Sequence, residues 1–123
     1  MKTLIILAVT LGMCFIININ NQTSIIGTWV STDDTSWKRI FKTDGKCYEY
    51  YGGQLQDTYV YSIKTGGVLC SKSIIQKPNI SYLELINVSN SQDKYCYEIA
   101  SLSQNYLQLI YFQNGKSQRF KRQ

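Results

Sequence analysis

The sequence predicts an all-β protein, folded as a single antiparallel up-and-down barrel of eight or nine strands. Tyrosine fits the pleated surface of a sheet, and it supplies ten of the aromatic residues, against four phenylalanines and two tryptophans. Turn signals such as Asp44-Gly45, Gly52-Gly53 and Asn114-Gly115 recur at short intervals between strand-like runs. The connections between these runs are too short for parallel crossovers, so neighbouring strands should be antiparallel.

The first four expected strands cover residues 26–31, 36–43, 46–51 and 55–64, with turns at 33–34, 44–45 and 52–53 between them. Successive side chains of a strand point to opposite faces of the sheet. We therefore place the charged residues Lys38, Lys42 and Glu49 on the solvent face. The positions expected to face the barrel interior are then Trp37, Arg39, Phe41, Tyr48, Tyr50, Tyr59, Tyr61 and Ile63.

The remaining expected strands cover residues 67–74, 80–88, 94–102, 106–113 and 116–122. In these strands Glu84, Glu98 and Gln108 should face solvent. The positions expected inside are Leu83, Leu85, Tyr95, Tyr97, Ile99, Leu107, Leu109 and Tyr111. One apolar face thus recurs from strand to strand, and a sheet with one wet face can bury the other by closing into a barrel.

Residues 1–22 are expected to form a signal peptide or lipoprotein leader, and residues 23–123 the barrel domain. Lys2 precedes an uncharged apolar run from Leu4 to Ile17, which is typical of a secretory signal and shorter than the about 20 residues of a membrane span. The run Leu11-Gly12-Met13-Cys14 resembles a bacterial lipobox, in which the cysteine is lipidated, although Met13 replaces the usual small residue. A cleaved signal, an uncleaved anchor and lipidated Cys14 all place the domain outside the cytoplasm, in the periplasm, the outer envelope or the medium.

Three cysteines remain beyond the leader, at Cys47, Cys70 and Cys96. They fall on the third, fifth and seventh expected strands. Next-but-one strands lie about 9.5 Å apart, whereas a disulfide requires Cα atoms within about 7 Å. Three free thiols are therefore expected. If one cysteine lies in a loop, the favoured bridge is Cys70–Cys96.

The composition argues against catalytic, cofactor and metal chemistry. The chain has no histidine, which removes the usual general base and metal ligand. It also lacks a Cys-x-x-Cys pair, and its glutamates are expected to face outward. We therefore expect no enzyme and no cofactor. Thirteen basic residues against eight acidic ones give a net charge of +5, but they are scattered along the chain, which favours a solvated surface over a nucleic-acid interface.

The run Gly27-Thr28-Trp29 at the start of the first expected strand resembles the opening motif of lipocalins and the wider calycin group. Together with the pieces around Phe41–Lys46, Cys96–Leu102 and Leu107–Arg122, it makes residues 25–123 similar to short lipocalin-like domains of exported Bacteroidetes proteins. That resemblance implies a barrel closed at one end by Trp29, with Arg122, or alternatively Arg119, packed over the indole. Streptavidin also opens with Gly-Thr-Trp, but it lines its biotin site with later tryptophans, and this chain has none after Trp37.

The resemblance and the aromatic interior favour one function and leave one alternative. The favoured function is an exported binding module for a small, largely apolar ligand. The side chains expected to contact this ligand inside the barrel are Trp37, Arg39, Phe41, Tyr48, Tyr50, Tyr61, Tyr97 and Tyr111. The alternative is a non-enzymatic envelope interaction module whose barrel is filled by its own side chains, with an unknown protein partner. Arg39 would receive a ligand carboxylate in the first case, and would lie near the barrel rim in water in the second.

Overall fold

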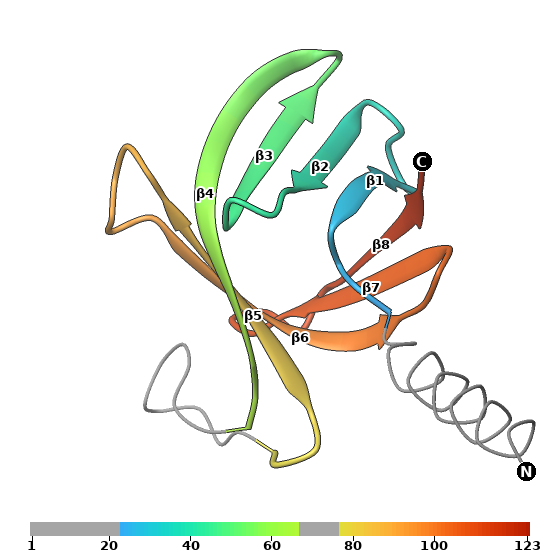
Figure 1. Ribbon diagram of the computed structural model, residues 1–123, viewed down its shortest axis with the longest axis vertical. Helices are drawn as coiled ribbons and strands as arrows, with labels where there is room; N and C mark the ends of the chain where they lie inside the picture. Colours follow the sequence, from blue (N-terminus) through green and yellow to red (C-terminus); the bar gives the residue numbers. More distant parts are fainter. Residues whose placement is uncertain (1–22, 67–76) are drawn as a thin grey trace, which may run out of the picture.

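The protein is an eight-stranded closed antiparallel barrel, seen here in a computed structural model that describes residues 23–66 and 77–123 (Figure 1). Each strand pairs with its neighbours in the chain, and the first strand pairs with the last to close the ring. This confirms the predicted up-and-down barrel. The strands are β1 (Gly27–Ser31), β2 (Trp37–Phe41), β3 (Lys46–Tyr51), β4 (Gln54–Thr65), β5 (Ser81–Asn87), β6 (Lys94–Leu102), β7 (Tyr106–Tyr111) and β8 (Ser117–Arg122).

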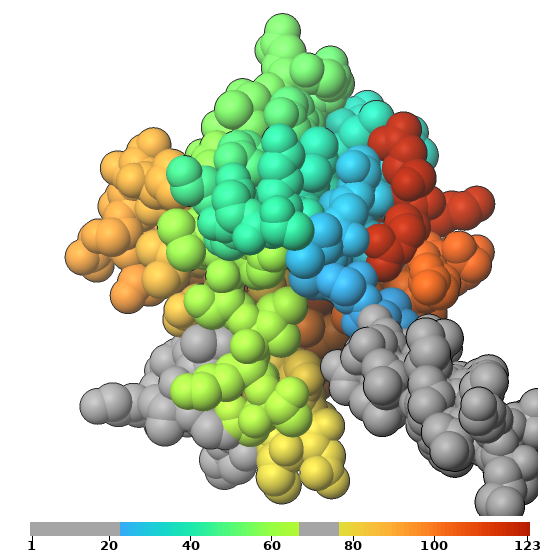
Figure 2. Space-filling view, viewed as in Figure 1, coloured from blue at the N-terminus to red at the C-terminus, as the bar shows by residue number. Residues whose placement is uncertain are grey.

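The barrel closes through its described strands, because β4 pairs directly with β5 along seven residue pairs from Tyr59↔Asn87 to Thr65↔Ser81. The additional strand expected at residues 67–74 lies outside the described residues, as does the expected leader with Cys14. Within residues 23–66 and 77–123, no helix is long and apolar enough to cross a membrane. The space-filling view shows β2, β1 and β8 packed side by side as one wall (Figure 2).

The tight turns expected from Asp-Gly and Asn-Gly are present and make similar contacts. The Asp44 carboxylate accepts a hydrogen bond from the amide of Lys46 at 2.9 Å, and Asn114 does the same for Lys116 at 2.9 Å. Gly45 has a φ of 82°, a conformation that costs glycine far less than other residues. Because such a turn sets the register of its hairpin, it also decides which residues of β2 and β3 face one another.

The core consists of the inward residues of all eight strands, most of them as expected. Fully or almost fully buried are Trp29, Phe41, Cys47, Tyr59, Leu83, Leu85, Tyr97, Leu107, Leu109 and Phe120. Tyr61, Tyr95, Ile99 and Tyr111 pack against this cluster while partly exposed. Ile63, also expected inside, is 41% exposed.

The faces of β3 are opposite to the expected ones. Cys47 is fully buried, and Glu49 turns inward to pair with Arg39, the residue directly opposite it in the β2–β3 register. Tyr48 and Tyr50 therefore lie on the outer face, where the Tyr48 hydroxyl donates to Asp44 at 3.1 Å. The expectation was wrong because it treated Glu49 as a solvated charge, whereas an inward arginine on the paired strand supplies its counter-charge.

One end of the barrel is closed by Trp29, as the resemblance implied. Its indole is fully buried and donates from Nε1 to the carbonyl of Ile25 at 2.7 Å. The guanidinium carbon of Arg122 lies 4.2 Å from the ring centroid. Arg122 also donates to the carbonyls of Ser24, Ile26 and Gln104 at 2.8, 2.8 and 2.6 Å. This arginine thus ties the last strand to the chain segment that enters the first.

The two described cysteines of the barrel differ in state. Cys47 is free and buried, whereas Cys96 on β6 is disulfide-bonded. The expectation of three free thiols is therefore wrong. It rested on placing every cysteine on a barrel strand, but β4 and β5 are paired to each other without a strand between them. Cys70, the partner we favoured for Cys96, lies outside the described residues.

Candidate functional site

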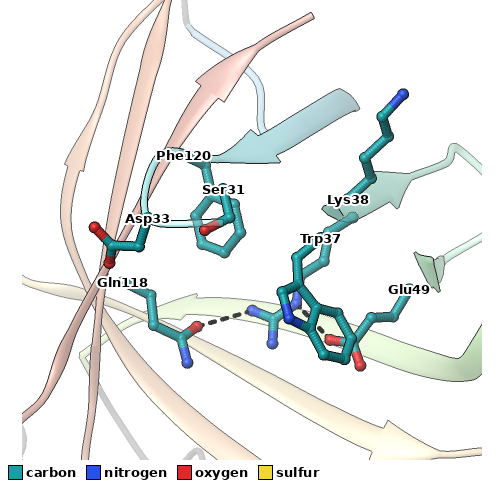
Figure 3. Close-up of a pocket in the computed structure, with 8 residues that line it drawn as sticks. Ser31, Asp33, Trp37, Lys38, Glu49, Gln118 and Phe120 are labelled. Carbon is teal, nitrogen blue, oxygen red and sulfur yellow. Dashed lines mark hydrogen bonds and ion pairs between the residues drawn. The ribbon is translucent and has the colours of Figure 1, made fainter. Parts of the chain in front are cut away.

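A cavity of about 250 Å³ opens beside the β1–β2 connection, and we call it the mouth pocket (Figure 3). It lies among the end of β1, the β1–β2 connection, and strands β2, β3 and β8. Its walls combine two acids, two bases, two aromatic rings and two neutral polar side chains. They are Ser31, Asp33, Trp37, Lys38, Arg39, Glu49, Gln118 and Phe120.

Arg39 is the most constrained group of the mouth pocket, with only 9% of the residue exposed. Its guanidinium donates to Glu49 Oε2 at 3.0 Å, to Gln118 Oε1 at 3.2 Å and to the Tyr97 hydroxyl at 3.3 Å. The guanidinium carbon also lies 5.4 Å from the ring centroids of both Tyr97 and Phe120. Because a guanidinium has five N–H donors, its bonds to these side chains leave two donors for another acceptor.

The charge of Arg39 is retained despite its burial. Burial by itself lowers the pKa of Arg39, but the nearby Tyr97 and Glu49 outweigh it and raise the pKa above its ordinary value. Arg39 and Glu49 form an ion pair whose side chains are 11% and 14% exposed. Asp33 and Lys38 also line the pocket, but their charged ends are directed away from Arg39 and Glu49 (Figure 3). The charges inside the mouth pocket are therefore those of Arg39 and Glu49, which balance one another.

Trp37 forms the exposed edge of the mouth pocket, with 38% of its surface accessible. It lies opposite Tyr51 in the β2–β3 register, and the two ring centroids are 4.6 Å apart with an interplanar angle of 51°. Tyr51 is itself 44% exposed. The pair provides an aromatic surface beside the polar groups, and Tyr51 limits how far the indole can swing away.

A second polar cluster lies at the connection between β5 and β6. The amide nitrogen of Asn87, a residue only 7% exposed, donates to Asp57 at 3.0 Å and to Asp93 at 3.1 Å. Its carbonyl oxygen accepts from the amide of Ser89 at 2.9 Å. Asp93 in turn raises the pKa of Tyr95 to about 12, through a hydrogen bond to the hydroxyl and with help from burial. Asn87 thus holds two carboxylates close together.

Of the eight residues expected to contact a ligand, only Trp37 and Arg39 meet at the mouth pocket. Phe41 and Tyr61 pack edge to face inside the barrel, with centroids 5.1 Å apart, and Tyr97 and Tyr111 are in contact at 5.4 Å. Tyr48 and Tyr50 lie on the outer face, as described above. The rings thus fill the barrel interior instead of lining one tyrosine cavity.

The sequence reasoning missed the acidic and amide members of the mouth pocket, including Glu49, Asp33 and Gln118. One signal could have found Glu49. The Asp44-Gly45 turn places residues 39 and 49 opposite one another, so an inward Arg39 needs an inward partner at that position. Gln118 comes from the far end of the chain, and only closure of β8 onto β1 brings it within reach of β2.

A larger groove of about 750 Å³ lies elsewhere on the barrel and is more apolar. Tyr61 is the one residue of the expected ligand set that lines it, together with Ile25, Ile63, Ile99 and Leu102 among others. Its walls reach Thr23 and Asn79.

Comparisons with protein-family models, with curated proteins and with solved structures find no match. The fold itself defines the class: an eight-stranded antiparallel closed barrel, compatible with a calycin or lipocalin-like architecture. Within residues 23–66 and 77–123 there is no group of three or more histidine, cysteine or acidic side chains suited to a metal ion. The side chains that line the mouth pocket can form hydrogen bonds, ion pairs and aromatic contacts.

Proposed function

We propose that the protein is an exported, non-enzymatic binding module that takes a small ligand at the mouth pocket. The observation that carries the proposal is Arg39, a charged and nearly buried side chain that lines an accessible cavity beside the exposed Trp37. Small-molecule sites typically combine apolar walls with a few fixed polar groups. Here Trp37 and Phe120 provide the walls, while Arg39, Glu49 and Gln118 provide the fixed groups.

The hydrogen bonds of Arg39 support this proposal, because they hold the guanidinium in place before any ligand arrives. Three different strands contribute its partners, namely Glu49 on β3, Tyr97 on β6 and Gln118 on β8. A side chain fixed in this way loses little further conformational freedom on binding, so the entropy cost of ordering it is small. A small, partly apolar ligand that also carries polar groups would use both parts of the site.

The alternative is an interaction module with a side-chain-filled barrel. It is favoured by the ring contacts of the interior, such as Phe41 with Tyr61 and Tyr97 with Tyr111. In that alternative Arg39 serves only to fill and brace the barrel. The two candidates differ in one respect that can be measured, because only the first requires a ligand whose retention depends on the accessible wall at Trp37.

Native mass spectrometry of the protein purified from its own cells tests the proposal. The expected result is a small-molecule adduct on the natural protein that is lost from a Trp37→Ala variant. Tyr106→Ala is the matched control, because Tyr106 is also an exposed aromatic residue, at 55%, and does not line the mouth pocket. An adduct that survives Trp37→Ala, or protein without any adduct, favours the side-chain-filled module.

Export is tested separately, because it depends on residues 1–22. Fractionation of cells that produce the full chain should find the protein outside the cytoplasm. Labelling with radioactive palmitate, compared with a Cys14→Ala variant, distinguishes a lipidated protein from one with a cleaved signal or an uncleaved anchor. Recovery of the protein in the cytoplasmic fraction contradicts this part of the proposal.

A further inference from the structure

We infer that the ligand of the mouth pocket is an uncharged sugar, bound as a single ring or as the terminal unit of a glycan. This inference rests on the proposed function, since it names the ligand class of the same site. Three properties of the pocket lead to it: balanced charge, hydrogen-bonding groups of both polarities, and an exposed aromatic surface at its edge.

The balance of charge disfavours a charged ligand. A carboxylate or phosphate attracted by Arg39 would also meet Glu49, and a cation attracted by Glu49 would meet Arg39. Moreover, Arg39 already shares its charge with Glu49 at 3.0 Å. Like charges brought together in a partly desolvated site oppose binding, so a neutral ligand avoids a cost that an ionic ligand incurs.

The hydrogen-bonding groups suit a ligand whose own groups both donate and accept. Gln118 accepts from Arg39 through Oε1, which leaves its amide nitrogen as a donor. Glu49 bonds to Arg39 through one carboxylate oxygen, which leaves its other oxygen as an acceptor. A sugar hydroxyl donates one hydrogen bond and accepts two, so neighbouring hydroxyls on one ring can bond to donors and acceptors that lie side by side.

The aromatic edge suits the apolar face of a sugar ring. A pyranose presents C–H groups on its faces, and these pack against the electron-rich face of an indole. Trp37 is 38% exposed, and Tyr51 contacts it at a centroid distance of 4.6 Å. The pocket volume of about 250 Å³ lies just below the roughly 300 Å³ at which sites for drug-sized molecules begin. A single ring is therefore a better match than an extended chain.

Tryptophan fluorescence tests this inference directly, because the two tryptophans differ in accessibility. Trp29 is fully buried and Trp37 is 38% exposed, so a ligand at the mouth pocket should alter the Trp37 emission. The neutral probes are the methyl glycosides of glucose, galactose and N-acetylglucosamine. The charged probes are glucose 6-phosphate, glucosamine and glycine. At least one neutral glycoside should give a saturable change with a Kd on the order of 1 mM.

Variants of Trp37 test whether the neutral glycoside binds at the mouth pocket. In ligand-observed NMR, Trp37→Ala should weaken binding of the neutral glycoside at least about tenfold, a loss of about 1.4 kcal/mol. Trp37→Phe retains a ring and should weaken it less, and Tyr106→Ala should leave the Kd unchanged. Near-ultraviolet circular dichroism establishes that each variant is folded, and the comparison of Trp37→Phe with Trp37→Ala holds even if the alanine variant is destabilised.

The outcomes separate this inference from the proposed function. Saturation by charged probes alone overturns the ligand class but leaves the mouth pocket as a binding site. Saturation by a neutral glycoside that is unaffected in Trp37→Ala places the sugar elsewhere and overturns the inference. Saturation by none of the neutral glycosides also overturns it, whereas the proposed function is then judged by the co-purified adduct and its dependence on Trp37.

Discussion

The guanidinium of Arg39 on β2 donates a hydrogen bond to the hydroxyl of Tyr97 on β6, with 3.3 Å between Nη2 and Oη. In the closed order from β1 to β8, these two strands lie on opposite sides of the ring. The contact therefore spans the barrel interior. This hydrogen bond fills the barrel interior between β2 and β6, and it holds Arg39 in place at the mouth pocket.

The ion pair of this arrangement predicts a large loss of stability when only one partner is removed. Arg39→Ala should lower the free energy of unfolding by about 3–5 kcal/mol, because Glu49 would keep a buried charge without its counter-charge. Urea unfolding at neutral pH measures the loss. The double variant Arg39→Met/Glu49→Leu should recover most of it, since no uncompensated charge remains. A double variant as unstable as Arg39→Ala contradicts this explanation.

Deletion of the Trp29 side chain should destabilise the closed end of the barrel. Trp29→Ala is expected to cost about 3–5 kcal/mol, as is usual for a large buried aromatic residue. Trp37→Ala is the matched comparison, because Trp37 is exposed and its loss should cost about 1 kcal/mol or less. Chemical denaturation of both variants provides the measurement. A loss within about 0.5 kcal/mol for Trp29→Ala is incompatible with its packing role.

A side chain at Gly27 is expected to strain the backbone and to displace the guanidinium of Arg122. The φ of Gly27 is 140°, and an added Cβ would lie 2.6 Å from Nη1 of Arg122. Gly27→Ala should therefore cost about 1–3 kcal/mol in unfolding free energy through backbone strain. The close contact between the new Cβ and Arg122 should increase this loss. Gly45→Ala serves as the control, because Gly45 also has a positive φ but open space around its Cα. Equal losses for the two variants would show that the contact with Arg122 contributes nothing.

The Cys47 thiol is expected to be unreactive in the folded protein. Burial raises its pKa to about 12, Glu49 adds to this rise, and Arg39 acts against it. The thiolate is the reactive form, so iodoacetamide at pH 8 should modify Cys47 only after unfolding. Peptide mapping after a timed reaction, with and without urea, measures the difference. Rapid modification of Cys47 in the native protein contradicts its burial.

The same shift predicts that stability falls at alkaline pH. The folded pKa of Cys47, about 12, lies above its ordinary value of 9.0, so the folded state holds the proton more tightly than the unfolded state. Its contribution is complete below pH 9 and is lost as pH rises toward 12. Unfolding free energies measured from pH 8 to 11 should decline, and a Cys47→Ala variant should decline less. If the unfolding free energies of the natural protein and of Cys47→Ala decline equally, Cys47 is not the cause of the alkaline loss of stability.

The bridge that Asn87 makes between Asp57 and Asp93 predicts a pH-dependent variant. Asn87→Asp places a third carboxyl group within hydrogen-bond distance of two others, and mutual repulsion raises its folded pKa above the unfolded value of about 3.9. At pH 7 the variant should lose about 2–3 kcal/mol of stability. Because the shift is upward, stability returns as pH falls through the raised folded pKa, and the recovery is complete near pH 4. Asn87→Ala, which adds no charge, should show no such recovery in acid urea unfolding.

The closed barrel and most of its core could be predicted from the sequence because both depend on local pattern. Alternation along each run assigns residues such as Leu83 and Leu107 to one face, and the Asp44-Gly45 turn is a local signal of a hairpin. The barrel end at Trp29 followed from a short motif and the C-terminal Arg122, whose contact the structure shows at 4.2 Å.

The candidate site was predicted only in part, because its members are defined by partners on other strands. A charged residue read alone is assigned to solvent, and Glu49 points inward only because Arg39 faces it across the β2–β3 hairpin. Basic residues are likewise scattered in the sequence, yet Lys38 and Lys121 both lie opposite Val30, one on each side of β1. Register between strands, not order in the chain, determines these neighbours.

By itself, the sequence determined the class of fold and the hairpin turns, because periodicity and turn chemistry act between residues close in the chain. The contact between Trp29 and Arg122 was implied by the resemblance to lipocalins. Only the tertiary structure decided which face of β3 is buried, that Cys96 is disulfide-bonded, and that Trp37, Arg39, Glu49 and Gln118 form one pocket. The physical reason is that a buried charge is stable only beside its partner. Closure of the barrel brings Gln118 from the last hairpin to an arginine 79 residues earlier.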